Sequence, residues 1–218
     1  MNGHHRSSVR ATLFAVPLAL AVLGATTGPA GAAPRPTRPL TCRGEGVDPG
    51  AAVRYRTETV IHAPLGVIWK LQTDVRNWPS WQAPVATMER LYHGPMRPGS
   101  AFRWTTPVPA DPSTPATTLS ITSTVRQIKH HACIRWTGPA TGEGLHIDGV
   151  HVWDFTKVEG GVLVRTEETH TGPQVDANVP AATKLLGDGL EGWLRSLKAT
   201  AEGTRSPATA CARTAVAG

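Results

Sequence analysis

Hydrophobic and polar residues alternate through most of the middle of this chain, and a period of two is typical of β-strands that bury one face. The alternation first occurs at residues 55–62 and ends there at Ala63-Pro64. It returns in six further runs, at residues 86–92, 100–106, 117–128, 131–137, 145–157 and 161–170. Breaks rich in Gly and Pro, at 94–99, 107–116, 138–144 and 158–161, separate most of these runs. We therefore expect six or seven strands joined by turns.

Two other stretches carry their hydrophobic residues at helical spacing. Residues 65–74 have apolar side chains at 67, 68 and 71, and a turn or second short helix follows at 77–81, with Pro79 near its start. Residues 179–202 carry a longer apolar stripe, at Val179, Ala182, Leu186, Leu190, Trp193, Leu194, Leu197 and Ala201. The order of one strand, two short helices, about six strands and one long helix predicts an α+β domain, in which helices cover one face of an antiparallel sheet.

The last two predicted strands can be aligned from the sequence, because Val158-Glu159-Gly160-Gly161 between them is a tight hairpin signal. If Lys157 faces Val162, the pairs on one side of the sheet are Phe155 with Val164, Trp153 with Thr166, and His151 with Glu168. The pairs on the other side are Asp154 with Arg165 and Val152 with Glu167. An opposite-charge pair suits a solvent-facing side, so we expect His151 and Glu168 to lie together on the covered side.

Tryptophan is the commonest aromatic residue, with seven Trp against three Phe and two Tyr. The alternation places Trp104, Trp136 and Trp153 on the covered face, and the long helix adds Trp193. Core packing is the plain interpretation of any one of them, but the same face also holds polar residues that an apolar core would leave without partners. We therefore predict an internal cavity lined by indole rings and a few polar groups. Its predicted ligand-binding residues are Trp81, Trp104, Ser123, Trp136, Trp153, Thr166, His170 and Trp193.

His151 and Glu168 are the candidate catalytic residues. A histidine beside a carboxylate in an apolar cavity could transfer a proton to or from a bound polyphenol or ketone. The alternative is that the two side chains satisfy each other's hydrogen bonds and only orient a ligand. No cofactor is expected, because the sequence has neither a P-loop nor a dinucleotide-binding motif. No metal is expected either, because His146, Asp148, His151 and His170 are spread over both faces of their strands.

The ends of the chain differ from this domain in composition. Arg6 and Arg10 precede an apolar run at 11–25 and small residues at 30–32, which is the pattern of a cleaved, Sec-type signal peptide. The run is shorter than the roughly 20 residues that a membrane span needs. We expect a secreted protein without a membrane span in its mature chain, with a signal peptide at 1–32, a flexible Pro-rich leader at 33–53, one domain at 54–203 and a flexible tail at 204–218.

Removal of residues 1–32 takes away two arginines and no acid, which lowers the formal charge from +6 to +4. The remaining basic residues are scattered, so no nucleic-acid partner is expected. In an exported protein, three cysteines can form at most one intramolecular disulfide. Cys133 lies in a strand-like run, where a buried free thiol is usual. We therefore expect Cys42 and Cys211 to form the disulfide and to tie both terminal segments to the domain.

Several stretches of the domain also carry a family signal. They are Thr57-Glu58-Thr59-Val60-Ile61-His62-Ala63-Pro64, Asn77-Trp78-Pro79-Ser80-Trp81, Pro98-Gly99-Ser100-Ala101-Phe102, His151-Val152-Trp153-Asp154-Phe155 and Trp193-Leu194-Arg195-Ser196-Leu197. Together they resemble the SRPBCC, or START-like, superfamily, and within it the polyketide cyclase/dehydrase-like branch. The resemblance covers residues 57–203 and implies a helix-grip fold, in which a curved antiparallel sheet wraps a long C-terminal helix around a deep hydrophobic cavity. Members bind lipids, sterols, plant hormones and polyketides, and some catalyse cyclisation or dehydration.

Three functions are compatible with these observations. The first is binding of a hydrophobic small molecule, of lipid, polyketide or aromatic type, in the Trp-lined cavity. The second is a cyclase or dehydratase activity, of lyase or isomerase type, on a polyketide-like substrate, with His151 and Glu168 as acid and base. The third is a non-enzymatic interaction module whose cavity has collapsed into an ordinary core.

Overall fold

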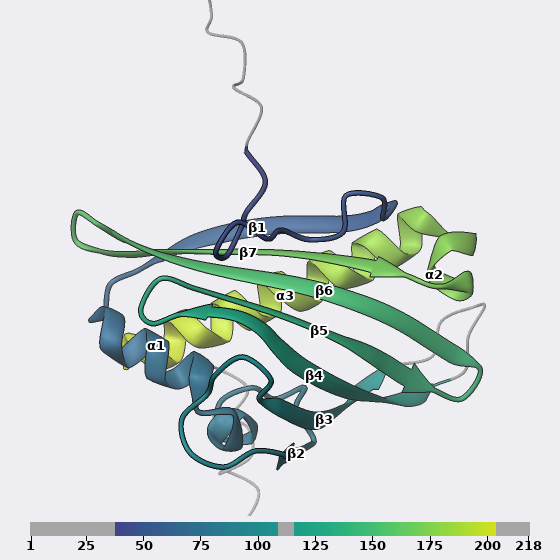
Figure 1. Cartoon of the computed structure of the whole chain (residues 1–218), viewed down its shortest axis with the longest axis horizontal. Helices are drawn as coiled ribbons and strands as arrows, with labels where there is room; N and C mark the ends of the chain where they lie inside the picture. The colour runs from purple at the N-terminus through teal and green to yellow at the C-terminus, as the bar shows by residue number, and fades with distance from the viewer. Residues whose placement is uncertain (1–37, 109–115, 204–218) are drawn as a thin grey trace, which may run out of the picture. The chain divides into compact units, whose positions relative to one another are not determined.

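The computed structural model describes residues 38–108 and 116–203. It contains a seven-stranded sheet with the strand order β1-β7-β6-β5-β4-β3-β2 (Figure 1). The strands are β1 (Val53–Ile61), β2 (Thr87–Arg90), β3 (Ala101–Val108), β4 (Thr117–Lys129), β5 (Cys133–Gly142), β6 (Leu145–Val158) and β7 (Gly161–Thr171). The helices are α1 (Leu65–Thr73), the 3-10 helix η1 (Val75–Ser80), α2 (Pro173–Ala177) and α3 (Val179–Ala201). The predicted α+β class and order of elements are confirmed, and α2 is an addition to them.

All neighbouring strands are antiparallel, and β6 and β7 pair in the predicted register. Lys157 lies opposite Val162, Trp153 opposite Thr166, and His151 opposite Glu168. Gly160 in the turn between the two strands has a φ of 74°, a conformation that glycine adopts without a steric penalty. The turn and the alternation of apolar residues therefore specify the same alignment.

The strand β5 is longer than predicted, because it continues through residues 138–142, whose composition is that of a break. A β-carbon on Gly138 would lie 1.9 Å from the carbonyl oxygen of Thr122 on β4. The register of β4 against β5 also shifts between Val125 and Gln127, as at a β-bulge. Gly138 therefore allows two strands to approach closely and does not end one of them.

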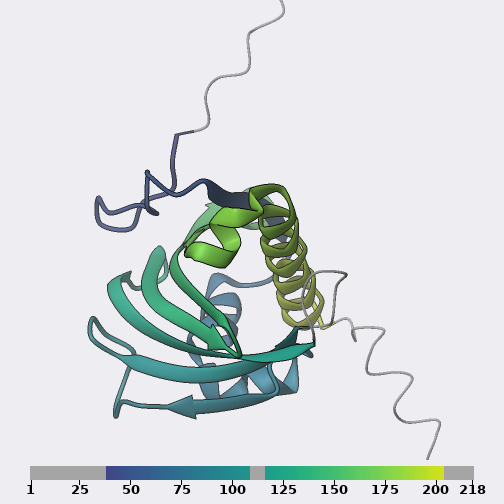
Figure 2. The same cartoon turned by 90° about the vertical axis from the view of Figure 1, so that its right-hand side faces the viewer.

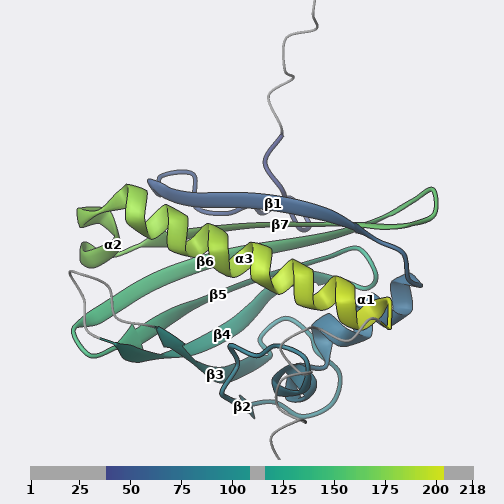
Figure 3. The same cartoon turned by 180° about the vertical axis from the view of Figure 1, so that it is seen from behind.

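The long helix α3 packs on the inner face of the sheet. Figure 2 shows the curvature of the sheet, and Figure 3 shows α3 in front of it. Its buried side chains include Leu186, Leu190, Leu194 and Leu197. Gly187 lies against Tyr55 of β1, where a β-carbon would come within 2.7 Å of the ring. A curved antiparallel sheet that grips a long C-terminal helix is the expected helix-grip fold. Among the described residues, none of the helices is long and apolar enough to cross a membrane.

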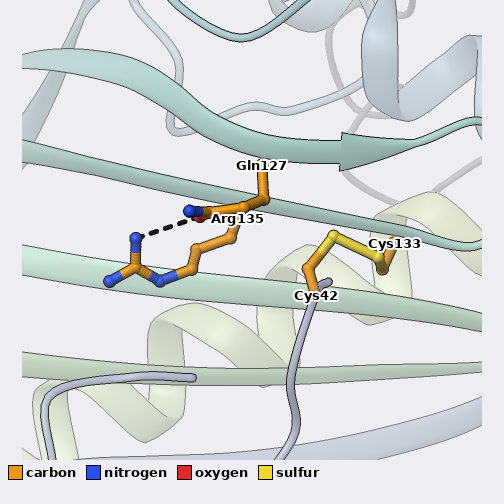
Figure 4. Close-up of a disulfide and its surroundings, with 4 residues drawn as sticks. All are labelled: Cys42, Gln127, Cys133 and Arg135. Carbon is orange, nitrogen blue, oxygen red and sulfur yellow. Dashed lines mark hydrogen bonds between the residues drawn. A yellow bond between two sulfur atoms is a disulfide. The ribbon is translucent and has the colours of Figure 1, made fainter. Parts of the chain in front are cut away.

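The outer side of the sheet is partly covered by residues 38–52, which a disulfide between Cys42 and Cys133 joins to β5 (Figure 4). Leu40 and Val47 are buried there with Val152 of β6. The predicted pairing of Cys42 with Cys211 is wrong, as is the free thiol predicted at Cys133, and Cys211 lies outside the described residues. Since Ile134 and Trp136 face the core, alternation along β5 turns Cys133 outward, towards the N-terminal segment.

The same segment buries the outer residue pair of Val152 and Glu167, which the sequence places on a solvent-facing side. Glu167 is only 2% exposed. Its carboxylate accepts hydrogen bonds from the backbone N–H of Leu40 at 2.8 Å and from Nε of Arg54 at 2.6 Å. Arg135 donates to the carbonyl oxygen of Gly46 at 2.7 Å and to the side-chain oxygen of Gln127 at 3.1 Å (Figure 4). From residue 38 onward, the expected flexible leader is therefore part of the packed structure.

We predict that Cys42→Ser and Cys133→Ser each lower the free energy of unfolding by about 2–5 kcal/mol, because the disulfide restricts the unfolded chain. The bond joins residues 91 positions apart, which makes this restriction large. Denaturant unfolding of the variants measures the loss, and Cys211→Ser, as the control, should keep the wild-type value. Non-reducing peptide mapping should recover a linked pair of peptides that contain Cys42 and Cys133. A linked pair with Cys42 and Cys211 would contradict the pairing.

A pair of glycines on α3 tests the contact between the helix and the sheet. Gly187→Ala should lower the free energy of unfolding by about 1–3 kcal/mol, because the new methyl group overlaps the Tyr55 ring. Gly189→Ala is the matched control, since nothing lies within 4 Å of its β-carbon position. Alanine has the higher helix propensity, so this variant should be up to about 1 kcal/mol more stable than wild type. Equal effects in chemical denaturation would show that α3 does not approach β1 in this way.

Candidate ligand-binding site on the inner face of the sheet

A hydrogen-bonded group of polar side chains lies on the inner face of β6 and β7. The shared register brings Nδ1 of His151 to 3.1 Å from Oε2 of Glu168. Nε2 of His151 lies 2.6 Å from the hydroxyl of Thr166. The other carboxylate oxygen of Glu168 lies 3.2 Å from Nε2 of His170. We call these four residues the polar cluster, and all four are among the predicted site residues.

The protonation states of this cluster follow from its burial. Burial lowers the pKa of His151 by more than the Glu168 carboxylate raises it, so the ring is neutral at pH 7. Burial raises the pKa of Glu168, but His151 and His170 together outweigh this effect and bring it below its ordinary value, so the carboxylate is ionised. A neutral His151 that donates Nδ1–H to Glu168 has its lone pair on Nε2, where it accepts from the Thr166 hydroxyl.

The polar cluster interrupts the apolar packing between α3 and the sheet. One apolar group surrounds Trp153 of β6 and includes Leu194 of α3. A second group surrounds Ile147 of β6 and includes Leu190 of α3. Between Trp153 and Ile147, the inner face of β6 carries only His151 and Gly149. The side chains of Glu168 and His170 are 18% and 21% exposed, so solvent reaches the cluster at this interruption.

Indole rings line one side of the polar cluster. The ring of His151 lies 4.9 Å from that of Trp153 and 5.3 Å from that of Trp136, measured between centroids. Trp193 of α3 continues the aromatic group, 6.4 Å from Trp153 and 5.9 Å from Trp104. Trp78 of η1 lies deeper, 4.8 Å from Trp193, and both Trp78 and Trp153 are at most 1% exposed. Trp104 and Trp193 are only partly buried.

The aromatic group contains more hydrogen-bond donors than acceptors. Nε1 of Trp193 donates to the side-chain oxygen of Gln72 at 3.1 Å, and the Gln82 amide donates to the Trp193 carbonyl at 3.1 Å. Four other buried donors have no acceptor among the described residues, namely Gln72 Nε2, Trp78 Nε1, Trp81 Nε1 and Trp153 Nε1. A buried donor without an acceptor is unfavourable, so this interior is suited to a molecule that supplies acceptor oxygens.

Two clefts in the described part of the chain lie away from this cluster. One, of about 600 Å³, lies beside α1 and the β2–β3 connection. The other, of about 550 Å³, lies beside Cys133 on the outer side of the sheet. Neither is lined by His151, Glu168 or Trp153. Around Trp78 and Trp153 the indole rings pack against one another. A ligand would therefore approach from the partly exposed side of the polar cluster.

The predicted site residues form a connected set, although not all of them surround His151. Trp136 and Trp153 contact the polar cluster, whereas Trp81 belongs to the group around Trp193, at 5.9 Å. Ser123 is buried on β4 opposite Phe102 of β3. Gln72 and Trp78 are absent from the prediction, because a helical Gln and an indole in a short turn give no face by alternation. Within the described residues, no group of three or more His, Cys, Asp or Glu side chains is arranged to hold a metal ion.

Comparison with known proteins gives this arrangement a context. Residues 52–202 match the model of the family described as polyketide cyclase/dehydrase and lipid transport. A hypothetical protein from Helicobacter pylori has a similar structure, with a TM-score of 0.54 at 16% identity over 70% of this chain and 90% of that one. A START superfamily protein from Mycobacterium smegmatis has a TM-score of 0.53 at 14% identity, over 69% of this chain and 97% of that one.

A third similar structure is StfQ, a di-domain ARO/CYC protein from the steffimycin biosynthetic pathway. Its TM-score is 0.54 at 19% identity, over 69% of this chain and 51% of that one. At such identities the solved structures show a common fold and nothing about a ligand. No curated protein is significantly similar in sequence. The family match spans the sheet and α3, and with the START-like structures it shows that this chain belongs to the polyketide cyclase/dehydrase and lipid transport family.

Proposed function

We propose that this protein binds a hydrophobic small molecule, of lipid, polyketide or aromatic type, on the inner face of the sheet beside α3. The observation that carries this proposal is the hydrogen-bonded pair of His151 and Glu168, placed against indole rings where the apolar packing is interrupted. A core built only for stability gains little from such a group, because removing an ionised carboxylate from water is costly. A binding site gains a polar anchor that fixes the orientation of an apolar ligand.

The unpaired donors of the aromatic group narrow the class of ligand. Indole N–H groups only donate, and three of them are buried without an acceptor among the described residues. Carbonyl or ether oxygens on a largely apolar framework would pair with such donors, while the indole faces pack against the framework. The proposed ligand is therefore an oxygenated polyketide or aromatic molecule in preference to a plain hydrocarbon. The family description and the ARO/CYC neighbour are consistent with this chemistry.

A cyclase or dehydratase activity is the second candidate, and the neutral state of His151 favours it. A neutral imidazole held by an ionised carboxylate can act as a general base. However, both ring nitrogens already have partners, Glu168 at Nδ1 and Thr166 at Nε2. A substrate hydroxyl would have to replace Thr166 before His151 could take its proton. Binding requires no such exchange, and we therefore place it first.

We also propose that the protein is secreted. The N-terminal pattern of Arg6, Arg10 and the apolar run at 11–25 supports export, although residues 1–37 lie outside the described part. The disulfide between Cys42 and Cys133 supports it independently, because such bonds persist in oxidising compartments. Secretion favours a ligand-binding protein over a biosynthetic enzyme. A polyketide cyclase acts in the cytoplasm on intermediates that are attached to a carrier protein, whereas a ligand-binding protein needs no such intermediate.

Native mass spectrometry of protein purified from its own host tests the proposed binding directly. We expect a bound small molecule, and re-addition of that molecule to stripped protein should quench tryptophan fluorescence because Trp136 and Trp153 flank the site. His151→Ala should weaken binding at least about tenfold, because it removes the hydrogen bond that holds the ionised Glu168 in place as part of the polar anchor. The matched control is His146→Ala, on the same strand but exposed and paired with Asp148. The intact mass also tests export, since removal of residues 1–32 is expected.

The outcomes of this experiment separate the three candidate functions. Conversion of the molecule by wild type, lost in His151→Ala while binding is retained, would establish the enzyme. Absence of any extractable molecule, with no quenching by a panel of oxygenated polyketides and lipids, would leave the interaction module as the correct description. Equal weakening in His151→Ala and His146→Ala would place binding away from the polar cluster.

The buried neutral state of His151 predicts an acid-sensitive fold. Its pKa is lowered in the folded state, so the unfolded chain binds more protons as pH falls below about 6.5, and stability falls with it. Glu168, whose pKa is also lowered, acts in the same direction nearer its ordinary value. Denaturant unfolding between pH 7.5 and 5.5 should show a slope that His151→Gln reduces, by at most about 1.4 kcal/mol per pH unit. An unchanged slope in His151→Gln would mean that folding does not change the pKa of His151.

A further inference from the structure

The cleft of about 600 Å³ beside α1 is formed separately from the inner face of the sheet. The second half of α1, the start of η1, the end of β2 with the loop that follows it, and the β4–β5 turn surround it. Figure 1 shows these elements together at the end of the sheet where α1 lies. Its volume is within the range of small-molecule sites in proteins. The question is which chemistry its side chains would recognise.

Arg90, the last residue of β2, is the most unusual group in this cleft. Its guanidinium carbon lies 3.9 Å from the centroid of the Tyr92 ring, so the planar face of the cation is stacked. Its Nε is buried and has no hydrogen-bond partner, and Arg90 forms no ion pair within the described ranges 38–108 and 116–203. A buried guanidinium N–H without an acceptor is unfavourable unless something else supplies one.

A neighbouring arginine on the other side of the sheet offers a contrast. Arg103 of β3 lies on the other side of the sheet and pairs with Glu89 at 3.3 Å. Glu89 and Arg90 are adjacent in β2, so they alternate between the two sides. The outer arginine therefore has a carboxylate partner within the protein, whereas the inner one stacks on Tyr92 and its Nε has no partner among the described residues.

The remaining lining of the cleft supplies both charge and apolar surface. Lys70 of α1 and His130 of the β4–β5 turn add donors beside Arg90. Trp69 and Met96 add an apolar floor, and the Trp69 ring lies 5.4 Å from that of His130. Asp74, also in the cleft, limits the positive charge and disfavours a ligand with two negative charges. These lining side chains suit a ligand that carries one anionic group on an apolar ring.

We propose that this cleft is a second ligand site, which binds a monoanionic aromatic carboxylate through Arg90. The carboxylate accepts from the Arg90 guanidinium, including its unpaired Nε–H, and the fork geometry of the group suits two parallel hydrogen bonds. Lys70 contributes a second charge, and the aromatic body of the ligand packs on Trp69 and Met96. The stacked Tyr92 ring holds the guanidinium in place before the ligand arrives. This site is independent of the proposed binding at His151.

Titration of the oxidised, ¹⁵N-labelled protein with 1-naphthoate tests the proposal. The indole N–H signal of Trp69, assigned by its loss in Trp69→Phe, should shift and saturate. The neutral analogue 1-naphthalenemethanol should bind at least about tenfold more weakly, because it lacks the charge-assisted hydrogen bonds. The dianion 1-naphthyl phosphate should bind no more tightly than 1-naphthoate. Arg90→Gln should weaken 1-naphthoate binding at least about tenfold, whereas the matched control Arg103→Gln should keep its affinity within about twofold.

A second variant covers the case in which Arg90→Gln disturbs β2. Lys70 is exposed on α1, and Lys70→Gln should weaken 1-naphthoate binding about threefold with an unchanged fold. Equal affinity for the acid and the alcohol would overturn the proposal, as would unchanged binding in both variants. Tighter binding of the phosphate would overturn its monoanionic selectivity. Shifts of the Trp193 signal without the Trp69 signal would place the ligand on the inner face and would also overturn it.

Discussion

The pairing of β6 with β7 determines which side chains lie on the inner and outer faces of the sheet. Residues 148–158 pair one to one with residues 161–171, and each strand alternates between an inner and an outer side. A slip of β7 by one residue against β6 would place Glu167 opposite His151 and turn Glu168 to the outer side. Glu168 would then meet the N-terminal segment, and Glu167 would lie on the inner face. One hairpin register therefore fixes the candidate site and the surface on which residues 38–52 pack.

The inner face combines two demands that oppose each other. The helix α3 needs apolar contacts to stay on the sheet, and Leu194 and Leu190 provide them on either side of the polar cluster. The cluster itself gains stability only because both nitrogens of His151 and both carboxylate oxygens of Glu168 have partners at close range. Indole rings suit this situation, since they offer large apolar surfaces together with a polar N–H. The aromatic group thus serves both packing and recognition, and its partly exposed members, Trp104 and Trp193, lie where these two uses meet.

Local patterns predict the strands, the long helix and the β6–β7 register, because alternation and a short turn act between neighbouring segments. The same patterns place His151, Glu168 and Thr166 together before any coordinates are known. The cover of the outer side is different, since Leu40 and Val47 lie in a segment without hydrophobic period and meet β6 over a long sequence separation. The sequence pattern does contain a signal for Cys133 as the disulfide partner of Cys42, because alternation along β5 turns Cys133 to the outer side. The two clefts depend on side-chain packing between distant elements, which no local pattern records.

The folded domain begins before the segment that matches the family, because residues 38–52 are part of the packed structure. The family match begins at residue 52, but Glu167 takes one of its hydrogen bonds from the backbone of Leu40, and Val152 is covered by Leu40 and Val47. A chain shortened to the matched residues would expose an apolar patch on the outer face and leave Cys133 as an unpaired thiol beside it. Two such chains could then associate through the patch and become covalently linked through Cys133. The N-terminal segment thus covers the apolar patch and holds the Cys133 sulfur in a disulfide, which leaves neither open to a second chain.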